Sequence, residues 1–396
     1  MSRARLFLKP KKEESLRRFH PWVFSGAIAA IQGDPAEGDL VEVFAADRTT
    51  FLGIGHYQIG SIAVRILSFR PVAIDQAFWT GRLQAACELR RTLGLTGSPD
   101  NDTCRLVYGE GDRLPGLIVD LYGTTAVMQA HSVGMYRARA AIADALKEVL
   151  GERVQHIYCK SEGTLPFKAA LEAENESLYG RPDAELLAVE KGLRFHVDWQ
   201  KGQKTGFFVD QRENRLLLEQ YARNRSVLNL FCYTGGFSVY AMRGGATLVH
   251  SVDSSARAVA LAEKNIALNF PDDTRHRAFT GDAFDFLEKT GDAYDLIILD
   301  PPAFAKHRNV LRNALLGYRK LHVPAFEKIR PGGILFTFSC SQVVSRNDFR
   351  LAVFSAAAQS GRHVRILHQL AQPPDHPVNI YHPEGEYLKG LVLEVE

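Results

Sequence analysis

The part of the sequence that most limits the fold is residues 227–253. An apolar run over residues 227–233 breaks at Thr234-Gly235-Gly236, a helical pattern follows over residues 237–243, and a second apolar run ends on Asp253. This order predicts a strand, a tight turn, a helix and a second strand. Such a unit is typical of a parallel sheet with helices on its faces.

The turn and the acid beyond it predict a nucleoside-cofactor site. Glycine lets the backbone turn sharply and approach a ligand, and a carboxylate at the end of the second strand can bind both hydroxyls of a ribose. The dinucleotide pattern G-x-G-x-x-G is absent, because only Gly235-Gly236 occurs and bulky Phe237 follows. A cofactor with a ribose but no phosphate fits better, so we predict S-adenosylmethionine. An ordinary β-α-β unit with a glycine turn is the alternative.

The α/β alternation continues to residue 395 and predicts a doubly wound, Rossmann-like sheet that ends in an antiparallel strand over residues 388–395. A helix expected over residues 310–329 contains Pro324 and should kink or split. Ligands of such sheets bind beyond the carboxyl ends of the strands. Three strands are each followed by a polar side chain there: His276–Thr280 by Asp282, Tyr294–Leu299 by Asp300, and residues 334–338 by Cys340. We assign Asp282 to the amino group of an adenine.

Asp300 and Cys340 predict the chemistry. They end consecutive strands, and paired strands lie about 5 Å apart, so both side chains can reach one substrate ring. Carbon 5 of a pyrimidine is too electron-poor to attack a sulfonium methyl group unaided, but addition of a thiolate to carbon 6 makes carbon 5 enamine-like. Because a thiolate is a strong nucleophile, we assign Cys340 as the nucleophile. Asp300 is assigned to bind and protonate the cytosine.

Other interpretations of this site remain open. Cys340 alone could be an inert thiol, and Cys232 competes as nucleophile, although its place inside a strand is typical of a small core residue. Enzymes that methylate exocyclic amines follow Asp/Asn-Pro-Pro directly with an aromatic residue, whereas here Ala303 comes first and Phe304 second. This difference favours carbon methylation over methylation of a guanine or adenine amine. A non-catalytic RNA-binding ribosome-assembly factor is the third alternative.

Residues 1–75 predict a small β-rich domain, with short strands expected over residues 40–45, 51–57 and 62–69. A basic start precedes these strands and leads into an aromatic pair. Lysine and arginine next to aromatic side chains are typical of a surface that binds phosphates and stacks on bases, although a solvated basic terminus is the alternative. The candidate RNA-binding residues are Arg17, Arg18, His20 and Trp22.

Residues 76–185 predict a linking helix and a small α+β domain, and residues 186–396 form the α/β domain. In the middle domain, Asp112 and Arg113 could contact a ligand, but an ion pair within the turn is the simpler interpretation. Just before the central strand, residues 202–212 are dense in polar groups. This segment could close over the cofactor, with Phe208 stacking and Gln211 donating a hydrogen bond, although a plain loop with a helix cap is the simpler interpretation.

The composition limits the cellular setting. A chain of 396 residues predicts two or three domains, and a net charge of only +3 means that any nucleic-acid surface must be local. Five scattered cysteines show no CxxC pair, which argues against a zinc site or a disulfide framework. No apolar run reaches membrane-spanning length, and the start of the chain does not have the pattern of a signal peptide. We therefore expect a cytoplasmic protein.

Five segments together resemble the ribosomal RNA large-subunit methyltransferase I family of RNA cytosine-5 methyltransferases. They are GEGDRLPG from Gly109, TGFFVDQR from Thr205, NLFCYTGGF from Asn229, DPPAF from Asp300 and FSCS from Phe338. The resemblance runs nearly end to end. It implies a β-barrel PUA-like RNA-binding domain, a small α+β domain and a class I methyltransferase domain.

The resemblance also implies a cofactor, a substrate and a set of site residues. The target would be a cytosine of large-subunit (23S) ribosomal RNA, with Cys340 and Asp300 as the catalytic residues. A second cysteine that follows the Asp-x-Pro motif in another cytosine-5 class is absent, so the base that removes the carbon 5 proton stays unassigned. A homodimer is an open arrangement. S-adenosylmethionine would lie near Phe208, Gln211, Asn229, Tyr233, Thr234, Gly235, Asp253, Asp282 and Asp300.

Overall fold

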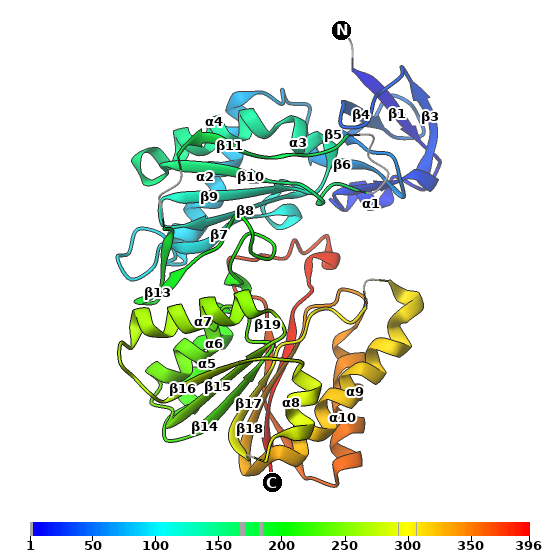
Figure 1. Cartoon of the computed structure of the whole chain (residues 1–396). Coiled ribbons are helices and arrows are strands. Elements are labelled where there is room, and N and C mark those ends of the chain that lie inside the picture. Colours follow the sequence, from blue (N-terminus) through cyan, green and yellow to red (C-terminus); the bar gives the residue numbers. More distant parts are fainter. Residues whose placement is uncertain (1–2, 167–170, 182–184, 292, 306) are drawn as a thin grey trace. The chain divides into compact units, whose positions relative to one another are not determined.

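A computed structural model describes residues 3–166, 171–181, 185–291, 293–305 and 307–396 (Figure 1). The chain divides into two compact units. The first comprises residues 1–192, 197–209 and 374–385, and the second comprises residues 193–196, 210–373 and 386–396. Residues 374–385 therefore belong with the N-terminal half of the chain, although they interrupt the C-terminal half in sequence. Among the described residues, no helix is long and apolar enough to cross a membrane.

The first unit begins with a six-stranded sheet in the order β2-β6-β5-β4-β1-β3, in which only β1 and β4 pair in parallel. Short helix α1 (Glu14–Arg17) lies between its first two strands. The strands expected over residues 40–45, 51–57 and 62–69 are confirmed as β4, β5 and β6. The strands are β1 (Ala4–Leu8), β2 (Trp22–Phe24), β3 (Ile28–Gln32), β4 (Leu40–Phe44), β5 (Phe51–Tyr57) and β6 (Ile62–Ser68).

Helix α2 (Gln76–Thr92) and a five-stranded sheet in the order β11-β10-β9-β8-β7 follow. The Asp75 side chain caps α2 by accepting a hydrogen bond from the Phe78 amide. Two helices, α3 and α4, follow β9 and meet at Ala138. The remaining elements are β7 (Thr103–Tyr108), β8 (Leu117–Tyr122), β9 (Thr125–Ala130), α3 (Val133–Arg137), α4 (Arg139–Leu150), β10 (His156–Lys160), β11 (Asn175–Gly180) and β12 (Leu187–Glu190).

The expected turn pair between Asp112 and Arg113 is wrong. The Asp112 carboxylate instead accepts two hydrogen bonds from the Arg90 guanidinium, at 2.5 and 2.8 Å, and Arg90 on α2 is fully buried. A buried carboxylate needs an ionic partner, because an unpaired buried charge costs several kcal/mol. Packing of α2 places Arg90, and not Arg113, within reach of Asp112. Arg113 is left exposed beside this pair.

The second unit has a seven-stranded sheet in the order β16-β15-β14-β17-β18-β20-β19. The first five strands run parallel, and β20 is antiparallel to both β18 and β19. The prediction of a doubly wound sheet with an antiparallel final strand is therefore confirmed. Figure 1 shows α5, α6 and α7 on one face of the sheet and α8, α9 and α10 on the other.

The strands of the second unit are β13 (Leu193–His196), β14 (Ser226–Leu230), β15 (Leu248–Asp253), β16 (His276–Thr280), β17 (Tyr294–Leu299), β18 (Ile329–Ser339), β19 (Val364–Ala371) and β20 (Lys389–Val395). The helices are α5 (Arg212–Tyr221), α6 (Gly236–Arg243), α7 (Ala256–Asn269), α8 (Ala283–Lys289), α9 (Leu311–Lys328) and α10 (Arg346–Ser360). Helix α9 runs unbroken through Pro324, so the expected split is wrong. Its buried residues on both sides of the proline, including Leu321 and Phe326, pack into the core and hold it together.

Candidate active site

Strands β17 and β18 bring Asp300 and Cys340 to the same edge of the sheet. The two strands pair in parallel with Leu299 opposite Thr337, so each chain leaves the sheet at its carboxyl end. Beyond the strands, the Ser341 hydroxyl donates a 2.6 Å hydrogen bond to the Ala305 carbonyl oxygen. This bond ties the loop that carries the acid to the loop that carries the thiol.

Tyr318 of α9 interacts electrostatically with both side chains. Its hydroxyl donates to the Ser339 hydroxyl at 2.8 Å. Burial raises the pKa of Tyr318, and the charges of Cys340 and Asp300 act in the same direction. Both groups therefore lie within electrostatic range of one phenol, while Cys340 itself is half-buried.

Lys389 is a component of this site that sequence reasoning missed. It begins β20 opposite Ser339, is only 6% exposed, and its Nζ donates to the carbonyl oxygens of Ser341 and Val344 at 2.5 and 2.8 Å. Burial lowers the pKa of Lys389 to about 8, against the opposing charge of Cys340. The available signal was a lysine at the start of a mostly apolar strand.

Gln211 orients the acid. Its Nε2 donates to Asp300 Oδ2 at 3.0 Å, and its Oε1 accepts from Asn214 Nδ2 at 2.6 Å. Because Gln211 is buried and held at both ends of its amide, it sets the direction of the Asp300 carboxyl group.

The loop between β14 and α6 has an unusual backbone. Phe231, Tyr233 and Gly235 have φ angles of 58°, 46° and 78°, a left-handed conformation that is uncommon for aromatic residues and typical of strained functional sites. A Cβ atom on Gly235 would lie 2.9 Å from Ala262 Cβ of α7. The glycine is therefore required both by its φ angle and by the packing of two helices.

Asp253 holds this loop in place. Its Oδ2 accepts from the Tyr233 amide and its Oδ1 from the Ser255 amide, both at 2.9 Å. A carboxylate oxygen can accept more than one hydrogen bond. Asp253 can therefore keep these backbone contacts and still accept ribose hydroxyls.

Asn229 and Thr234 are buried on either side of the same loop. Asn229 Nδ2 donates to the Ser238 hydroxyl at 2.9 Å, and the Thr234 carbonyl oxygen accepts from Asn265 Nδ2 at 2.9 Å. Asn229 Oδ1 and Thr234 Oγ1 have no hydrogen-bond partner in the described part of the chain. Buried polar atoms without partners are costly, so these two fit a bound group with donors to offer, as the ammonium and hydroxyls of S-adenosylmethionine are.

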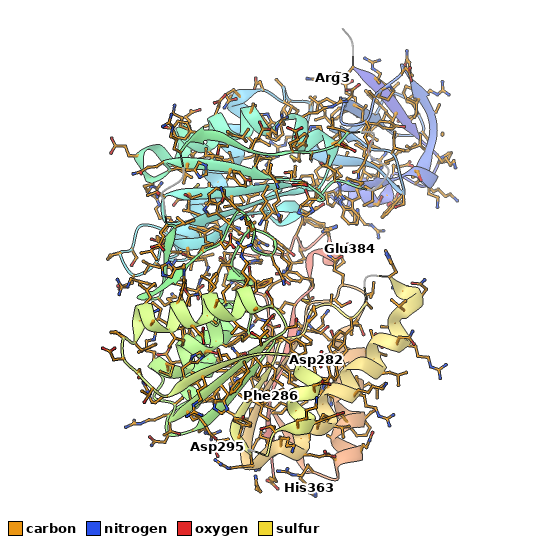
Figure 2. The ribbon with its side chains drawn as sticks, in the orientation of Figure 1. Arg3, Asp282, Phe286, Asp295, His363 and Glu384 are labelled. Atoms are coloured by element: carbon orange, nitrogen blue, oxygen red, sulfur yellow. The ribbon has the colours of Figure 1, made fainter. Side chains whose placement is uncertain are left out.

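Asp282 caps a helix. Its Oδ1 accepts from the amides of Phe284 and Asp285 at 2.8 and 3.1 Å, which alone accounts for an acid at this position. A cavity of about 450 Å³ lies beside α8, with Asp282 and Phe286 in its wall. Figure 2 labels both residues. The assignment of Asp282 to adenine stays a prediction.

The remaining sequence candidates lie in the first unit. Phe208 has the ammonium of Lys204 5.0 Å from its ring centre. Arg17 and Arg18 are exposed at the end of α1, whereas the Trp22 indole donates to Glu110 Oε1 at 2.8 Å and its ring lies 4.3 Å from that of His382. The His20 ring lies 5.6 Å from His382 as well. Two of the four RNA-binding candidates are thus open to solvent, and two are packed against residues 374–385.

Comparison with known proteins matches both parts of the chain. The profile of S-adenosylmethionine-dependent methyltransferases matches residues 162–390, and that of PUA-like domains matches residues 6–69. The chain is similar to a methyltransferase whose crystal structure was solved in complex with SAH. The two sequences are 25% identical, and the structures superpose with a TM-score of 0.84, covering 99% of this chain and 100% of that chain. A methyltransferase structure from Streptococcus mutans, 24% identical with a TM-score of 0.83, shows the same fold.

The sheet order, the strand-end acids and the matched profile define a class I methyltransferase with S-adenosylmethionine as its cofactor. Two relatives are named ribosomal RNA large subunit methyltransferase I. The one from Alteromonas mediterranea is 38% identical in sequence over 99% of both chains. The one from Aeromonas hydrophila is 39% identical over 98% of this chain and 99% of that one. The chain belongs to the ribosomal RNA large subunit methyltransferase I family.

Proposed function

We propose that the protein methylates carbon 5 of a cytosine in large-subunit (23S) ribosomal RNA through a covalent adduct with Cys340. The observation that carries the proposal is the thiol of Cys340 and the carboxyl group of Asp300 on adjacent strand ends, joined by the bond from Ser341 to Ala305. The name of these relatives supports ribosomal RNA as the substrate. No step of the proposal requires a second copy of the chain.

The reaction needs a nucleophile and a proton donor on opposite parts of the ring. The Cys340 thiolate adds to carbon 6 while Asp300 hydrogen-bonds and protonates ring nitrogen 3, so the electron pair of the carbon 5–carbon 6 bond becomes available at carbon 5. S-adenosylmethionine supplies an electrophilic methyl group. Once carbon 5 is methylated, a base removes the carbon 5 proton, the carbon 5–carbon 6 double bond is restored, and Cys340 leaves as thiolate. Ring nitrogen 3 returns its proton to Asp300, so the acid is regenerated.

The target carbon must leave the base stack before the thiol can reach it. Carbon 6 is attacked from the face of the ring, and that face is covered in a stacked strand. We therefore expect the cytosine to be flipped into the site. The buried Gln211 would then hold Asp300 ready for the ring edge before the base arrives.

The packing of Phe304 favours carbon methylation over amine methylation. Its ring lies 4.7 Å from that of Tyr318 at an angle of 43°, and it packs against the core beneath α9. The aromatic residue nearest to Asp300-Pro301-Pro302 is thus engaged with the protein rather than presented to a flipped base.

We also propose roles for the other candidate residues, which would bind RNA or the cofactor. Arg17 and Arg18 contact the RNA backbone, and Phe208 covers the cofactor. Asn229, Tyr233, Thr234, Gly235, Asp253 and Asp282 line the cofactor pocket. Three domains, divided after residues 75 and 185, would carry these functions.

A mechanism-based trap tests the reaction. RNA that contains 5-fluorocytosine should form a stable adduct with the protein in the presence of S-adenosylmethionine, because fluorine at carbon 5 cannot leave as a proton does. A denaturing gel should show the adduct for the native chain and none for Cys340→Ala.

Cys232→Ala is the matched control. Cys232 is 6% exposed in the loop between β14 and α6, not inside the strand as expected, and burial raises the pKa of its thiol above the usual range. This variant should form the adduct. A Cys340→Ala protein that still methylates RNA, or an adduct that depends on Cys232, would overturn the assignment.

A further inference from the structure

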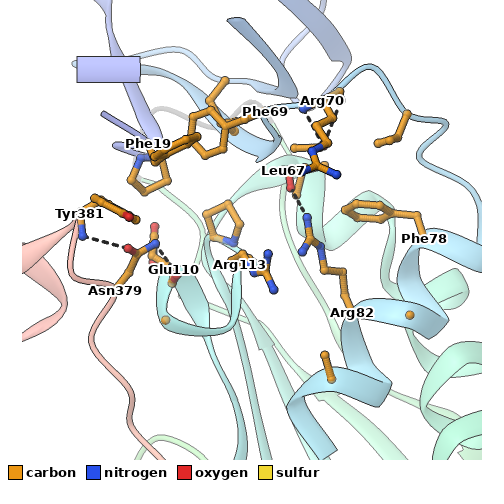
Figure 3. Close-up of a pocket in the computed structure, with 18 of the residues that line it drawn as sticks. Phe19, Leu67, Phe69, Arg70, Phe78, Arg82, Glu110, Arg113, Asn379 and Tyr381 are labelled. Carbon is orange, nitrogen blue, oxygen red and sulfur yellow. Dashed lines mark hydrogen bonds between the residues drawn. The ribbon is translucent and has the colours of Figure 1, made fainter. Parts of the chain in front are cut away.

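A cavity of about 1130 Å³ lies in the first compact unit, apart from the thiol and acid of the proposed reaction (Figure 3). Its walls come from the end of α1, the end of β6, the first half of α2, the turn after β7, and residues 379–381. The methyl-transfer chemistry uses none of these side chains.

Three arginines line the cavity without an acid to neutralise them. Arg70, Arg82 and Arg113 form no ion pair within the described residues, and Arg82 is held by donating to the Leu67 carbonyl oxygen at 3.0 Å. Figure 3 shows the guanidinium groups of Arg82 and Arg113 close together. Burial lowers the pKa of Arg82, and the charge of Arg113 lowers it further. Two neighbouring cations of this kind are stabilised by an anion placed between them.

The two acids in the cavity wall are engaged elsewhere. Asp75 caps α2 through the Phe78 amide at 3.0 Å. Glu110 Oε1 accepts from Arg65 Nη1 at 2.6 Å and from the Trp22 indole at 2.8 Å. Arg65 neutralises Glu110, and three arginines outnumber Asp75, so the cavity wall carries a net positive charge that favours phosphate.

Exposed aromatic rings form the opposite wall. Phe19 is 49% exposed and Tyr381 50% exposed, and the Phe19 ring lies 5.4 Å from both the Phe69 and the Tyr381 ring. Phe19 has a φ angle of 63°, a left-handed conformation that is strained for an aromatic residue. Asn379 accepts a hydrogen bond from the Tyr381 amide at 3.0 Å and so braces the second ring.

We propose that this cavity binds a single-stranded segment of the substrate RNA, with a base against Phe19 and Tyr381 and its phosphates at Arg82 and Arg113. The inference rests on the proposed function, because it takes RNA as the substrate. Aromatic faces bind bases only when these are unstacked from a duplex, and the planar guanidinium matches two phosphate oxygens at once.

The combination of rings and arginines selects RNA over a lone anion. A free phosphate would use the guanidinium groups and leave the exposed rings without a function, whereas a nucleotide segment uses both. Contacts in this cavity would add binding affinity to that provided by the reacting nucleotide.

Binding of a labelled oligoribonucleotide of about ten nucleotides tests the proposal. Tyr381→Ala and Arg113→Ala should each weaken binding, measured by fluorescence anisotropy, by about tenfold, because a stacked base and a phosphate contact are each lost. Arg113→Ala should also reduce the slope of log affinity against log salt by about 0.7. Both side chains are exposed, so neither change should unfold the chain.

Two controls sharpen the result. Arg91→Ala removes an equal charge from the exposed side of α2, where Arg91 pairs with Glu88, and should leave the affinity within about twofold. Arg113→Lys should restore part of the salt dependence. Unchanged affinity in both Tyr381→Ala and Arg113→Ala would overturn the proposal. The proposal would also be overturned if a duplex of the same sequence bound as tightly as the single strand and lost as much affinity in the two variants.

The outcome is separable from the test of the reaction. If the 5-fluorocytosine adduct forms while the pocket variants bind RNA normally, the reaction stands and the cavity is not an RNA site. If the cavity binds RNA through these residues but Cys340 forms no adduct, the binding site stands and the reaction assignment falls.

Discussion

Lys389 gives the clearest prediction for a single side chain. Its ammonium ion holds the carbonyl oxygens of Ser341 and Val344 and acts on the charge of Cys340, so it should stabilise the thiolate. In Lys389→Met, alkylation of Cys340 by iodoacetamide at pH 7 should slow by about tenfold, equivalent to one pKa unit. Mass spectrometry of the modified peptide follows the rate.

The pH dependence of the alkylation rate distinguishes an electrostatic role of Lys389 from a purely structural one. Because burial brings the pKa of Lys389 to about 8, the ammonium ion is lost above that pH, and the native and Lys389→Met rates should converge there. Lys389→Arg should keep the native rate at pH 7. Lys328→Met is the matched control, since Lys328 Nζ donates to the Thr290 carbonyl oxygen far from the thiol. A constant ratio of rates from pH 7 to pH 9 would count against an electrostatic role.

Among the loops and helices, the turn between β14 and α6 should be the most sensitive to a small change. In Gly235→Ala, the new methyl group meets Ala262 Cβ at 2.9 Å and the residue must keep a φ angle of 78°, so we expect a loss of about 2–3 kcal/mol in the free energy of unfolding. Affinity for S-adenosylmethionine should fall as well. Urea unfolding and calorimetry measure the two effects.

Gly245→Ala separates backbone strain from crowding. Gly245 has a φ angle of 86°, but its nearest neighbour to a new Cβ, Arg223 Cγ, is 3.8 Å away. This variant should lose only about 1 kcal/mol and keep its cofactor affinity. Equal losses in the two variants would show that the packing of α6 on α7 does not matter.

Across the full chain, both compact units should lose stability in acid. His56 in the first unit and His322 in the second are buried, and burial lowers the pKa of each from 6.5 to about 4. The unfolded chain takes up a proton at each site below pH 6.5 while the folded chain does not, so stability falls as the pH drops towards 4. Each histidine should cost about 2 kcal/mol at pH 5.

Thermal unfolding at pH 7.5 and pH 5 checks this expectation. His322→Gln should have a smaller difference in melting temperature between the two pH values than the native chain. His363→Gln, which changes an exposed histidine, should keep the native difference. If His322→Gln also keeps it, the acid sensitivity has another origin.

Local patterns predicted the regular elements of the second unit well. Strands β16 and β17 have the bounds expected from their apolar residues and the breakers that flank them, because those signals lie within or next to the element itself. Strand β11, Asn175–Gly180, was not predicted, because its polar sequence lacks an apolar alternation and only pairing with β10 makes it a strand. The unbroken course of α9 through Pro324 likewise depends on packing against the core.

The sequence alone determined the α/β class, the cofactor and the strand-end position of Asp300 and Cys340, because parallel strands bring their carboxyl ends to one edge wherever they pair. Only the tertiary structure could show that Lys389 lies beside the thiol and that Asp112 pairs with Arg90. It alone also shows that residues 374–385 join the first unit and place Tyr381 beside Phe19. These contacts join residues far apart in the chain, and no local propensity encodes them.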